Sequence, residues 1–264
     1  MRVLAAVVAG ALLSMSQGPP APERPRVLGI AHVSVQVSDM TAARAFYGGV
    51  LGLAEARPAT TPRRAVFVIN ARQRLIVQDG LPPDRDERLI NVGFDVDRPG
   101  LADTTDPDGH AIQFVTTANP PDAPSTPDRR ISTRMLHAGL TIKDVAAADT
   151  FYKETLGFSE IWRGGRPEGT ISWINMRVPG GTDYIEYMLY PGAPPTRQQL
   201  GSAHHVALLV PDIQQALETV RARTRPGDRN HRATPNIGVN NRWQLNLFDP
   251  DGTRVEFMEP FTAR

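Results

Sequence analysis

A short segment near the C-terminus combines a tight turn with a carboxylate on a strand. Asp249-Pro250-Asp251-Gly252 has the composition of a turn, because proline presets one dihedral angle and glycine accepts a positive one. The residues after it alternate and favour a strand, on which Glu256 stands between Val255 and Phe257. A carboxylate among large apolar side chains is paired, bound to metal, or on the solvent face. Taken alone, this strand favours the solvent face for Glu256. The rest of the chain favours a paired or metal-bound carboxylate instead.

Histidine recurs at one position of a repeated pattern. Three histidines on predicted strands are each followed, after six intervening residues, by an aspartate suited to cap a helix: His32 with Asp39, His137 with Asp144, and His205 with Asp212. The first two histidines are 105 residues apart, and so are Phe46 and Phe151. A repeat at constant offset is hard to obtain by chance, so the chain contains duplicated units.

Each unit has the pattern strand, helix, and then three strands. The first unit begins with a strand at 27–37 and a helix at 41–47, followed by strands at 65–70 and 74–78. The second unit is truncated, because its strand at 90–97 leaves only eight residues before Asp106 and no room for a helix. Its closing turn repeats the C-terminal turn, with Gln113 in the position of Glu256 and Asn91 in that of the unit's histidine.

Composition divides the 264 residues into segments. Arg2, an apolar run and a small-residue end are typical of a secretory signal peptide at 1–17, and predict a periplasmic or secreted protein without a stable membrane anchor after cleavage. A Pro-rich leader follows at 18–26 and a Pro-rich linker at 118–131. These segments delimit an N-terminal domain at 27–117 and a C-terminal domain at 132–264.

The overall composition is that of a globular protein with a real core. Hydrophobic residues make up 41% and charged residues 22% of the chain, and the net charge of +1 argues against a nucleic-acid partner. The absence of cysteine excludes disulfides and thiolate metal sites. A small-molecule substrate is the expected partner, and a homodimer is compatible with the sequence.

Four such units, with histidines on first strands and carboxylates on last strands, resemble the vicinal oxygen chelate superfamily. That superfamily includes glyoxalase I, extradiol dioxygenases, fosfomycin-resistance enzymes and bleomycin-binding proteins. The resemblance covers roughly residues 27–260 and is strongest over 132–260. It implies an α+β fold of four tandem βαβββ modules, the second truncated, which pair into two cup-shaped curved sheets that can hold a divalent metal ion.

The resemblance places the metal site in the C-terminal domain. It makes His137, His205 and Glu256 ligands, and Glu186 matches the fourth ligand of glyoxalase I. The spacings agree, with 49 residues from His137 to Glu186 and 51 from His205 to Glu256. Two imidazoles and one or two carboxylates suit one Fe²⁺, Mn²⁺, Ni²⁺ or Zn²⁺ ion and leave positions open for substrate. Each residue also has a structural alternative, since a lone strand histidine is usually a hydrogen-bonded core residue, and families with three ligands use the position of Glu186 otherwise.

Other residues near these positions receive structural roles. His204 neighbours a ligand on a strand and therefore points to the opposite face, as packing or as support for the ligands. In the N-terminal domain only His32 remains, with Asn91 and Gln113 at the later positions and Gln78 near the last one, so we expect no metal there. Phe46-Tyr47 and Phe151-Tyr152 are interpreted as helix packing. Five further aromatic residues could line a pocket: Trp162, Trp173, Trp243, Tyr184 and Tyr187.

The resemblance implies a metal-dependent enzyme that acts on a small substrate chelated through vicinal oxygens. Glyoxalase-like proton transfer, isomerisation or lyase chemistry is favoured, with Glu186 as the catalytic carboxylate. The alternatives are an extradiol-type dioxygenase, a non-catalytic sequestering protein of the bleomycin-resistance type, and a catalytically silent exported scaffold. Extradiol dioxygenases carry a Tyr three residues before the Asp-Pro turn and an earlier His. Here Asn246 and the segment 237–240 stand instead, and neither supplies an acid–base group.

The signal-peptide pattern makes a direct prediction about the mature N-terminus. In a host that exports the protein, we expect cleavage between Gln17 and Ala21, where the apolar run gives way to small and Pro-rich residues. N-terminal sequencing of the exported protein measures the site. Recovery of the protein with an intact Met1 in the cytoplasm would contradict the prediction.

Overall fold

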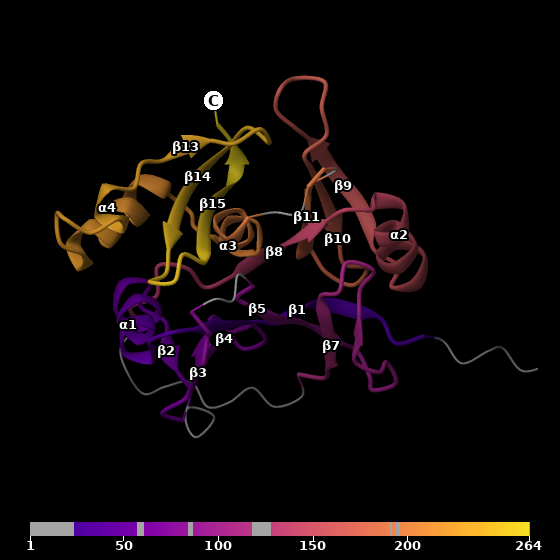
Figure 1. The fold of residues 1–264 in the computed structure, drawn as a ribbon, viewed down its shortest axis with the longest axis horizontal. Coiled ribbons are helices and arrows are strands. Elements are labelled where there is room, and N and C mark those ends of the chain that lie inside the picture. Colours follow the sequence, from indigo (N-terminus) through magenta and orange to yellow (C-terminus); the bar gives the residue numbers. More distant parts are fainter. Residues whose placement is uncertain are drawn as a thin grey trace, which may run out of the picture.

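The computed structural model describes residues 24–56, 61–83, 87–117, 128–190, 192–193 and 196–263. The predicted signal peptide, most of the leader and residues 118–127 of the predicted linker lie outside these ranges. Within them, no helix is long and apolar enough to cross a membrane. The two halves of the chain lie one above the other in Figure 1, the N-terminal half below in indigo to magenta and the C-terminal half above in orange to yellow.

Each half of the chain forms one mixed sheet. The N-terminal sheet has the order β2-β3-β4-β1-β5-β7-β6, with the bounds β1 Val27–Val37, β2 Ala54–Glu55, β3 Arg64–Val68, β4 Arg74–Asp79, β5 Leu89–Val96, β6 Thr104–Thr105 and β7 Ala111–Val115. The C-terminal sheet has the order β13-β14-β15-β12-β8-β11-β10-β9, with the bounds β8 Met135–Ile142, β9 Ser159–Gly164, β10 Trp173–Arg177, β11 Tyr184–Leu189, β12 His205–Leu209, β13 Asn236–Ile237, β14 Arg242–Phe248 and β15 Arg254–Thr262.

The strand order confirms the predicted pairing of modules. The first strands of two modules pair antiparallel at the centre of each sheet, β1 with β5 and β8 with β12. Each of these strands also pairs parallel with a later strand of its own module: β1 with β4, β5 with β7, β8 with β11, and β12 with β15. The prediction of an α+β fold with tandem modules in two sheets is therefore confirmed.

The predicted helix starts are observed where the sequence placed them. Asp39, Asp144 and Asp212 each accept two backbone N–H bonds as N-caps. They begin α1 (Met40–Arg44), α2 (Val145–Asp149) and α4 (Ile213–Arg223), and π-helical turns Ala45–Val50 and Thr150–Thr155 extend the first two. The truncated second module has no helix among residues 97–103, which the structure describes in full. Helix α3 (Arg197–Ala203), which the sequence did not predict, begins with a capping box at Thr196.

The two halves exchange buried hydrogen bonds through their repeated turns. Tyr47, after α1, donates its hydroxyl hydrogen to Asp249 of the last turn of the C-terminal half, at 2.9 Å. Tyr152, after α2, donates in the same way to Asp106 of the N-terminal half, also at 2.9 Å. Both tyrosine rings are fully buried, which agrees with the interpretation of these residues as packing. The hydroxyl bonds add a reciprocal link between halves that sequence alone did not indicate.

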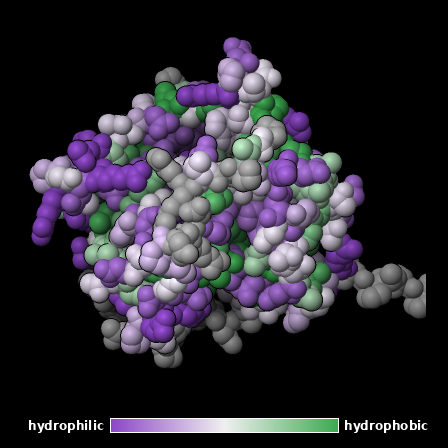
Figure 2. All heavy atoms as spheres, in the orientation of Figure 1, coloured by the Kyte–Doolittle hydropathy of each residue, from purple (hydrophilic) through white to green (hydrophobic). Residues whose placement is uncertain are grey.

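The face of the molecule drawn in Figure 2 is largely hydrophilic, with hydrophobic residues in small separate patches. Phe261, with 72% of its surface exposed, is among the few exposed large hydrophobic residues of the described chain. Isolated exposed apolar side chains are common on monomers. This face therefore gives no support to the predicted homodimer, which stays a prediction.

The reciprocal Tyr–Asp bonds predict similar losses of stability in two variants. Tyr47→Phe and Tyr152→Phe each leave a buried aspartate with one donor fewer, at a cost of about 1–3 kcal/mol. Chemical unfolding measures both free energies, with Tyr190→Phe as a control on an ordinary tyrosine. A loss confined to one variant would show that the two turns do not hold the halves together equivalently.

Candidate metal centre

The four predicted ligands lie on four adjacent strands at the centre of the C-terminal sheet. His137 stands on β8, Glu186 on β11, His205 at the start of β12 and Glu256 on β15. Since side chains alternate along a strand, all four point to the same face. Small residues stand between them in the register, with Ala207 paired to both His137 and Glu256.

Gly139 has the same role on the other side of the site. It pairs with both His205 and Glu186, so it separates these two ligands across the sheet. A Cβ atom at this position would lie 2.1 Å from Nδ1 of His205. The imidazole therefore occupies the space that any other residue at this position would fill.

The donor atoms of the four side chains converge. Nε2 of His137 lies 2.9 Å from Nε2 of His205. An oxygen of Glu186 lies 3.8 Å from the first nitrogen and 3.6 Å from the second. An oxygen of Glu256 lies 3.9 Å and 3.4 Å from the same two atoms. The donor atoms of His137, Glu186 and His205 form a group that could hold a metal ion.

These separations fit one shared ion. Ligand atoms about 2.1 Å from an ion lie about 3.0 Å apart at adjacent octahedral corners and about 3.4 Å apart at tetrahedral corners. The observed distances between these donor atoms, 2.9 to 3.9 Å, span these values. Nδ1 of His205 donates to the carbonyl oxygen of Ala203 at 2.7 Å, which leaves the lone pair on Nε2. Nη2 of Arg254 lies 3.0 Å from that Nε2 and 3.9 Å from Glu256, so a bound ion would take the place of the guanidinium. The residues present therefore fit a divalent ion.

Burial sets the electrostatics of the site. It lowers the pKa of both His137 and His205 well below the usual value, so the imidazoles are neutral and can act as ligands. Burial and, after it, the neighbouring Glu256 raise the pKa of Glu186 to about 8. Two carboxylates in one buried site repel each other, and a cation between them removes that cost.

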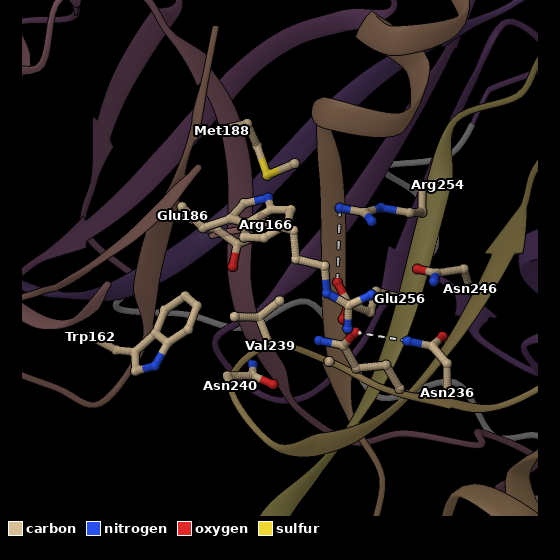
Figure 3. A pocket seen from close by; sticks show the side chains of 13 residues that line it. Trp162, Arg166, Glu186, Met188, Asn236, Val239, Asn240, Asn246, Arg254 and Glu256 are labelled. Carbon is tan, nitrogen blue, oxygen red and sulfur yellow. Dashed lines mark hydrogen bonds and ion pairs between the residues drawn. The ribbon is translucent and has the colours of Figure 1, made fainter. Parts of the chain in front are cut away.

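A cavity of about 240 Å³ opens over Glu186 and Glu256 (Figure 3). Its lining combines two arginines, Arg166 and Arg254, with amide and aromatic side chains: Asn236, Asn240, Gln244, Asn246, Trp162 and Trp173. Sequence reasoning missed both arginines. Arg254 could have been found, because it stands two residues before Glu256 on the same strand and therefore on the same face.

The predicted aromatic pocket is correct only in part. Trp162 and Trp173 line the cavity. Tyr184 instead stacks on the ring of His137, with centroids 4.6 Å apart, and Tyr187 and Trp243 pack in the hydrophobic core. The alternation of side chains along strands β11 and β14 could not assign these faces without the register. Their placement in the core corrects the sequence expectation for these two residues.

The N-terminal sheet contains the corresponding residues without their charges. Nε2 of His32 lies 3.1 Å from both Asn91 Oδ1 and Gln113 Oε1, so the repeat-equivalent residues do meet. The register places Ile76, rather than Gln78, at the position equivalent to Glu186. Burial lowers the pKa of His32, so this half offers one neutral imidazole and two amides. This donor set brings no negative charge to an ion, and the absence of metal from the N-terminal half stays a prediction.

Comparison with known proteins agrees with this geometry. Residues 134–257 match the sequence model of the Glyoxalase/Bleomycin resistance protein/Dioxygenase superfamily. The C-terminal half is a domain of this superfamily. A search of curated proteins finds no match.

Solved structures of dioxygenases share the fold of both halves. The 2,3-dioxygenase LapB from Pseudomonas sp. KL28 has 18% identity and a TM-score of 0.65, with 90% of this chain and 94% of that chain covered. A variant of homoprotocatechuate 2,3-dioxygenase from Brevibacterium fuscum has 21% identity and a TM-score of 0.65, with 91% and 73% covered. At these identities the likeness shows the fold alone.

The close approach of Gly139 to His205 predicts a selective loss of metal affinity in the superfamily domain. Gly139→Ala should displace the imidazole and weaken binding of Zn²⁺ or Fe²⁺ by about 10–100-fold, the range for lost support of a ligand. Calorimetric titration of the metal-free protein measures this affinity. Gly93→Ala is the matched control, because its Cβ would lie 2.1 Å from Cε1 of His32 in the half without the charged ligands. Equal losses in the two variants would contradict the assignment.

Proposed function

We propose that this protein is a divalent-metal-dependent enzyme that transfers a proton on a small substrate bound through two neighbouring oxygen atoms. One observation carries the proposal. Four buried donor atoms of His137, Glu186, His205 and Glu256 converge beside a cavity of small-molecule size whose other charged side chains are arginines. Carboxylates and arginines together suit chemistry in which negative charge develops on substrate oxygens.

The four ligands of the C-terminal sheet would hold the ion. When bound, a divalent ion supplies a Lewis acid that stabilises negative charge on a substrate oxygen. Glu186, His137 and His205 would occupy positions that leave the cavity side open to substrate. The pairing of every ligand strand within one sheet fixes these side chains on a rigid scaffold, as a preorganised site requires.

Charge balance in the cavity favours an anionic substrate or intermediate. A bound divalent ion would keep both glutamates ionised, and together with the neutral imidazoles the set then sums to zero charge. Arg166 and Arg254, which line the cavity, then leave it positive. The amides of Asn236, Asn240 and Asn246 provide neutral hydrogen-bond partners around it. An enediolate, with two adjacent charged oxygens, matches this arrangement.

Glu186 is the residue proposed to accept the proton. Among the described residues that line the cavity, the titratable side chains are two glutamates and two arginines, and arginine does not exchange protons at neutral pH. Glu186 and Glu256 lie at similar distances from the two imidazoles, but Glu256 is the more buried of the two carboxylates. Glu186 is therefore the carboxylate better placed to serve the substrate.

Extradiol ring cleavage is the second candidate. It is favoured by the fold shared with two dioxygenases and by a set of two imidazoles and a carboxylate, which suits Fe²⁺ oxygenases. The cavity, as far as the structure describes its lining, lacks the acid–base side chains that assist ring cleavage. Its described lining contains no histidine or tyrosine, and Asn240 and Asn246 stand at the positions where the sequence lacks the dioxygenase acid–base groups. A general acid–base group contributes about 10²–10⁴-fold in rate, so this candidate ranks second.

Exchange of the substrate's α-proton with solvent tests the proposed reaction. The metal-loaded protein should exchange the proton of thiol adducts of 2-oxoaldehydes or of small α-hydroxy ketones with D₂O, as followed by NMR. Glu186→Gln should slow exchange by about 10²–10⁴-fold at saturating metal, because the amide cannot accept the proton. Gln113→Glu, which changes the residue of the other half equivalent to Glu256, is the control and should leave the rate unchanged.

Two outcomes would overturn this ordering. The first is formation of the yellow ring-cleavage product from catechol or 2,3-dihydroxybiphenyl after anaerobic loading with Fe²⁺ and addition of oxygen. The second is tight binding of an enediolate mimic without any exchange, which would indicate a sequestering protein. Metal content of each variant, measured in parallel, separates loss of the ion from loss of the base.

A further inference from the structure

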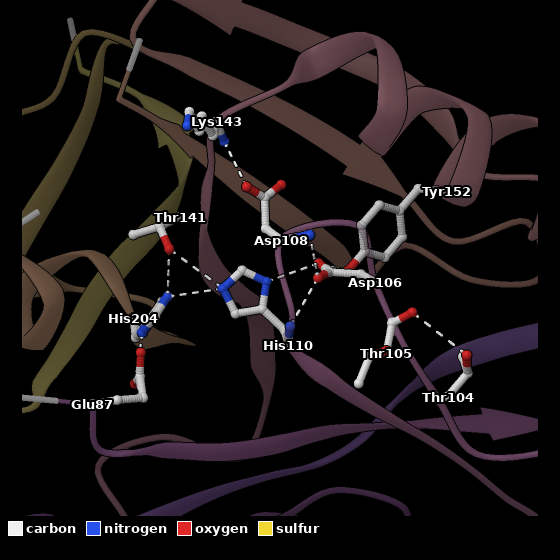
Figure 4. A network of polar contacts seen from close by, with 10 residues as sticks. All are labelled: Glu87, Thr104, Thr105, Asp106, Asp108, His110, Thr141, Lys143, Tyr152 and His204. Atoms are coloured by element: carbon white, nitrogen blue, oxygen red, sulfur yellow. Dashed lines mark hydrogen bonds and ion pairs between the residues drawn. The ribbon is translucent and has the colours of Figure 1, made fainter. Parts of the chain in front are cut away.

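We propose a second divalent-cation site, held by His110, His204 and Thr141 at the junction of the two halves. His110 follows the closing turn of the N-terminal half, whereas His204 precedes β12 and Thr141 stands on β8. Figure 4 shows these side chains directed toward one another, with Asp106 and Glu87 behind the two imidazoles. All three proposed ligands are buried. None of them belongs to the metal centre described above.

The two imidazoles repeat the geometry of the first metal centre. Nε2 of His110 lies 3.1 Å from Nε2 of His204, with ring centroids 5.0 Å apart and ring planes at 89°. For His137 and His205 the corresponding values are 2.9 Å, 5.0 Å and 89°. Two perpendicular imidazoles that meet through Nε2 present their lone pairs to one point, as two ligands of one ion do.

Carboxylates behind both rings fix which nitrogen faces that point. Nδ1 of His110 lies 2.8 Å from Asp106 Oδ2, and Nδ1 of His204 lies 2.8 Å from Glu87 Oε1. When Nδ1 donates to a carboxylate, the neutral form of each ring has its lone pair on Nε2. A carboxylate bonded to the far nitrogen is the usual support of a metal-bound histidine.

Asp106 is held in place by donors other than His110. Tyr152 and two backbone N–H groups also donate to it. An acidic side chain thus stands behind each of the two rings, which favours a cation in front of them.

Thr141 completes a triangle of donor atoms. Its Oγ1 lies 2.8 Å from Nε2 of His204 and 3.3 Å from Nε2 of His110. With the 3.1 Å between the two nitrogens, these edges match the roughly 3.0–3.4 Å between ligands of an ion with bonds of about 2.1 Å. Thr141 and Ala203 line a cavity of about 310 Å³. Water in this cavity can reach the side of the site at Thr141 and serve as the fourth ligand of the ion. Two imidazole nitrogens as ligands favour Zn²⁺.

The fold itself does not require these residues. In the repeat-equivalent turn, Thr253 takes the position of His110 and donates the same backbone N–H bond, to Asp249 at 2.8 Å. Gln36 and Ile90 stand at the positions equivalent to Thr141 and His204. The C-terminal turn nevertheless forms, and its Asp249 accepts the hydrogen bond from the hydroxyl of Tyr47. The histidines are therefore an addition to one of two otherwise similar junctions, where an ion would join the halves.

Titration of the full-length, metal-stripped protein with Zn²⁺ tests the proposal. The parent is the His137→Ala/Glu256→Gln variant, which weakens the first centre. We expect it to retain one calorimetrically detected Zn²⁺ that raises Tm. Adding His110→Thr, the residue that the equivalent turn already uses, should remove that ion and the rise in Tm. Adding Glu87→Gln instead should weaken the ion's Kd by about 10–100-fold.

Each result decides the question. Zn²⁺ binding and Tm that are the same with and without His110→Thr would overturn the proposal and leave the imidazoles sharing a proton. If the His110→Thr variant does not fold, the Glu87→Gln variant decides alone, and an unchanged Kd would overturn the site. Wild-type protein should bind two ions, one more than the sequence predicts, and a count of one that the His110→Thr variant retains would also contradict the second site. Failure here leaves the proposed proton transfer intact, because that reaction uses other residues.

Discussion

The C-terminal sheet is built around the burial of two carboxylates beside two imidazoles. Glu186 and Glu256 each lie within 4 Å of both His137 and His205, in the interior of a strand array. Burying charge is costly unless it is paired, so a cation is the simplest way to stabilise this group. The small residues that pair with the ligands across the sheet follow from the same requirement. Only glycine at position 139 leaves space for the imidazole of His205.

Duplication explains why one half can lose this chemistry without losing the fold. The N-terminal sheet keeps the strand order at its centre and the meeting point of His32, Asn91 and Gln113. Amides satisfy a buried imidazole by hydrogen bonding and carry no charge, so that centre is stable as a neutral cluster. The N-terminal half, which lacks charged ligands, still contributes Tyr47 and Asp106 to the junction with the C-terminal half.

The junction couples the halves through polar contacts as well as apolar packing. Each repeated turn accepts a tyrosine hydroxyl from the other half, and a single hydrophobic cluster includes residues of both sheets. A buried aspartate with several donors fixes the orientation of the halves more sharply than apolar contact does, because hydrogen bonds are directional. The His110–His204 cluster lies at one of these two junctions, close to the strand that carries His205.

The sequence by itself determined the repeat, the helix caps and the truncated module, because each depends on local periodicity or on constant spacing. The family resemblance singled out four residues that the structure brings together: His137, Glu186, His205 and Glu256. Tertiary structure decided what each face meets. Arg166 enters the cavity from a different segment, Ile76 takes the fourth ligand position of the other half through register, and His110 reaches His204 from 94 residues away. Such contacts depend on how two sheets pack, which no local pattern encodes.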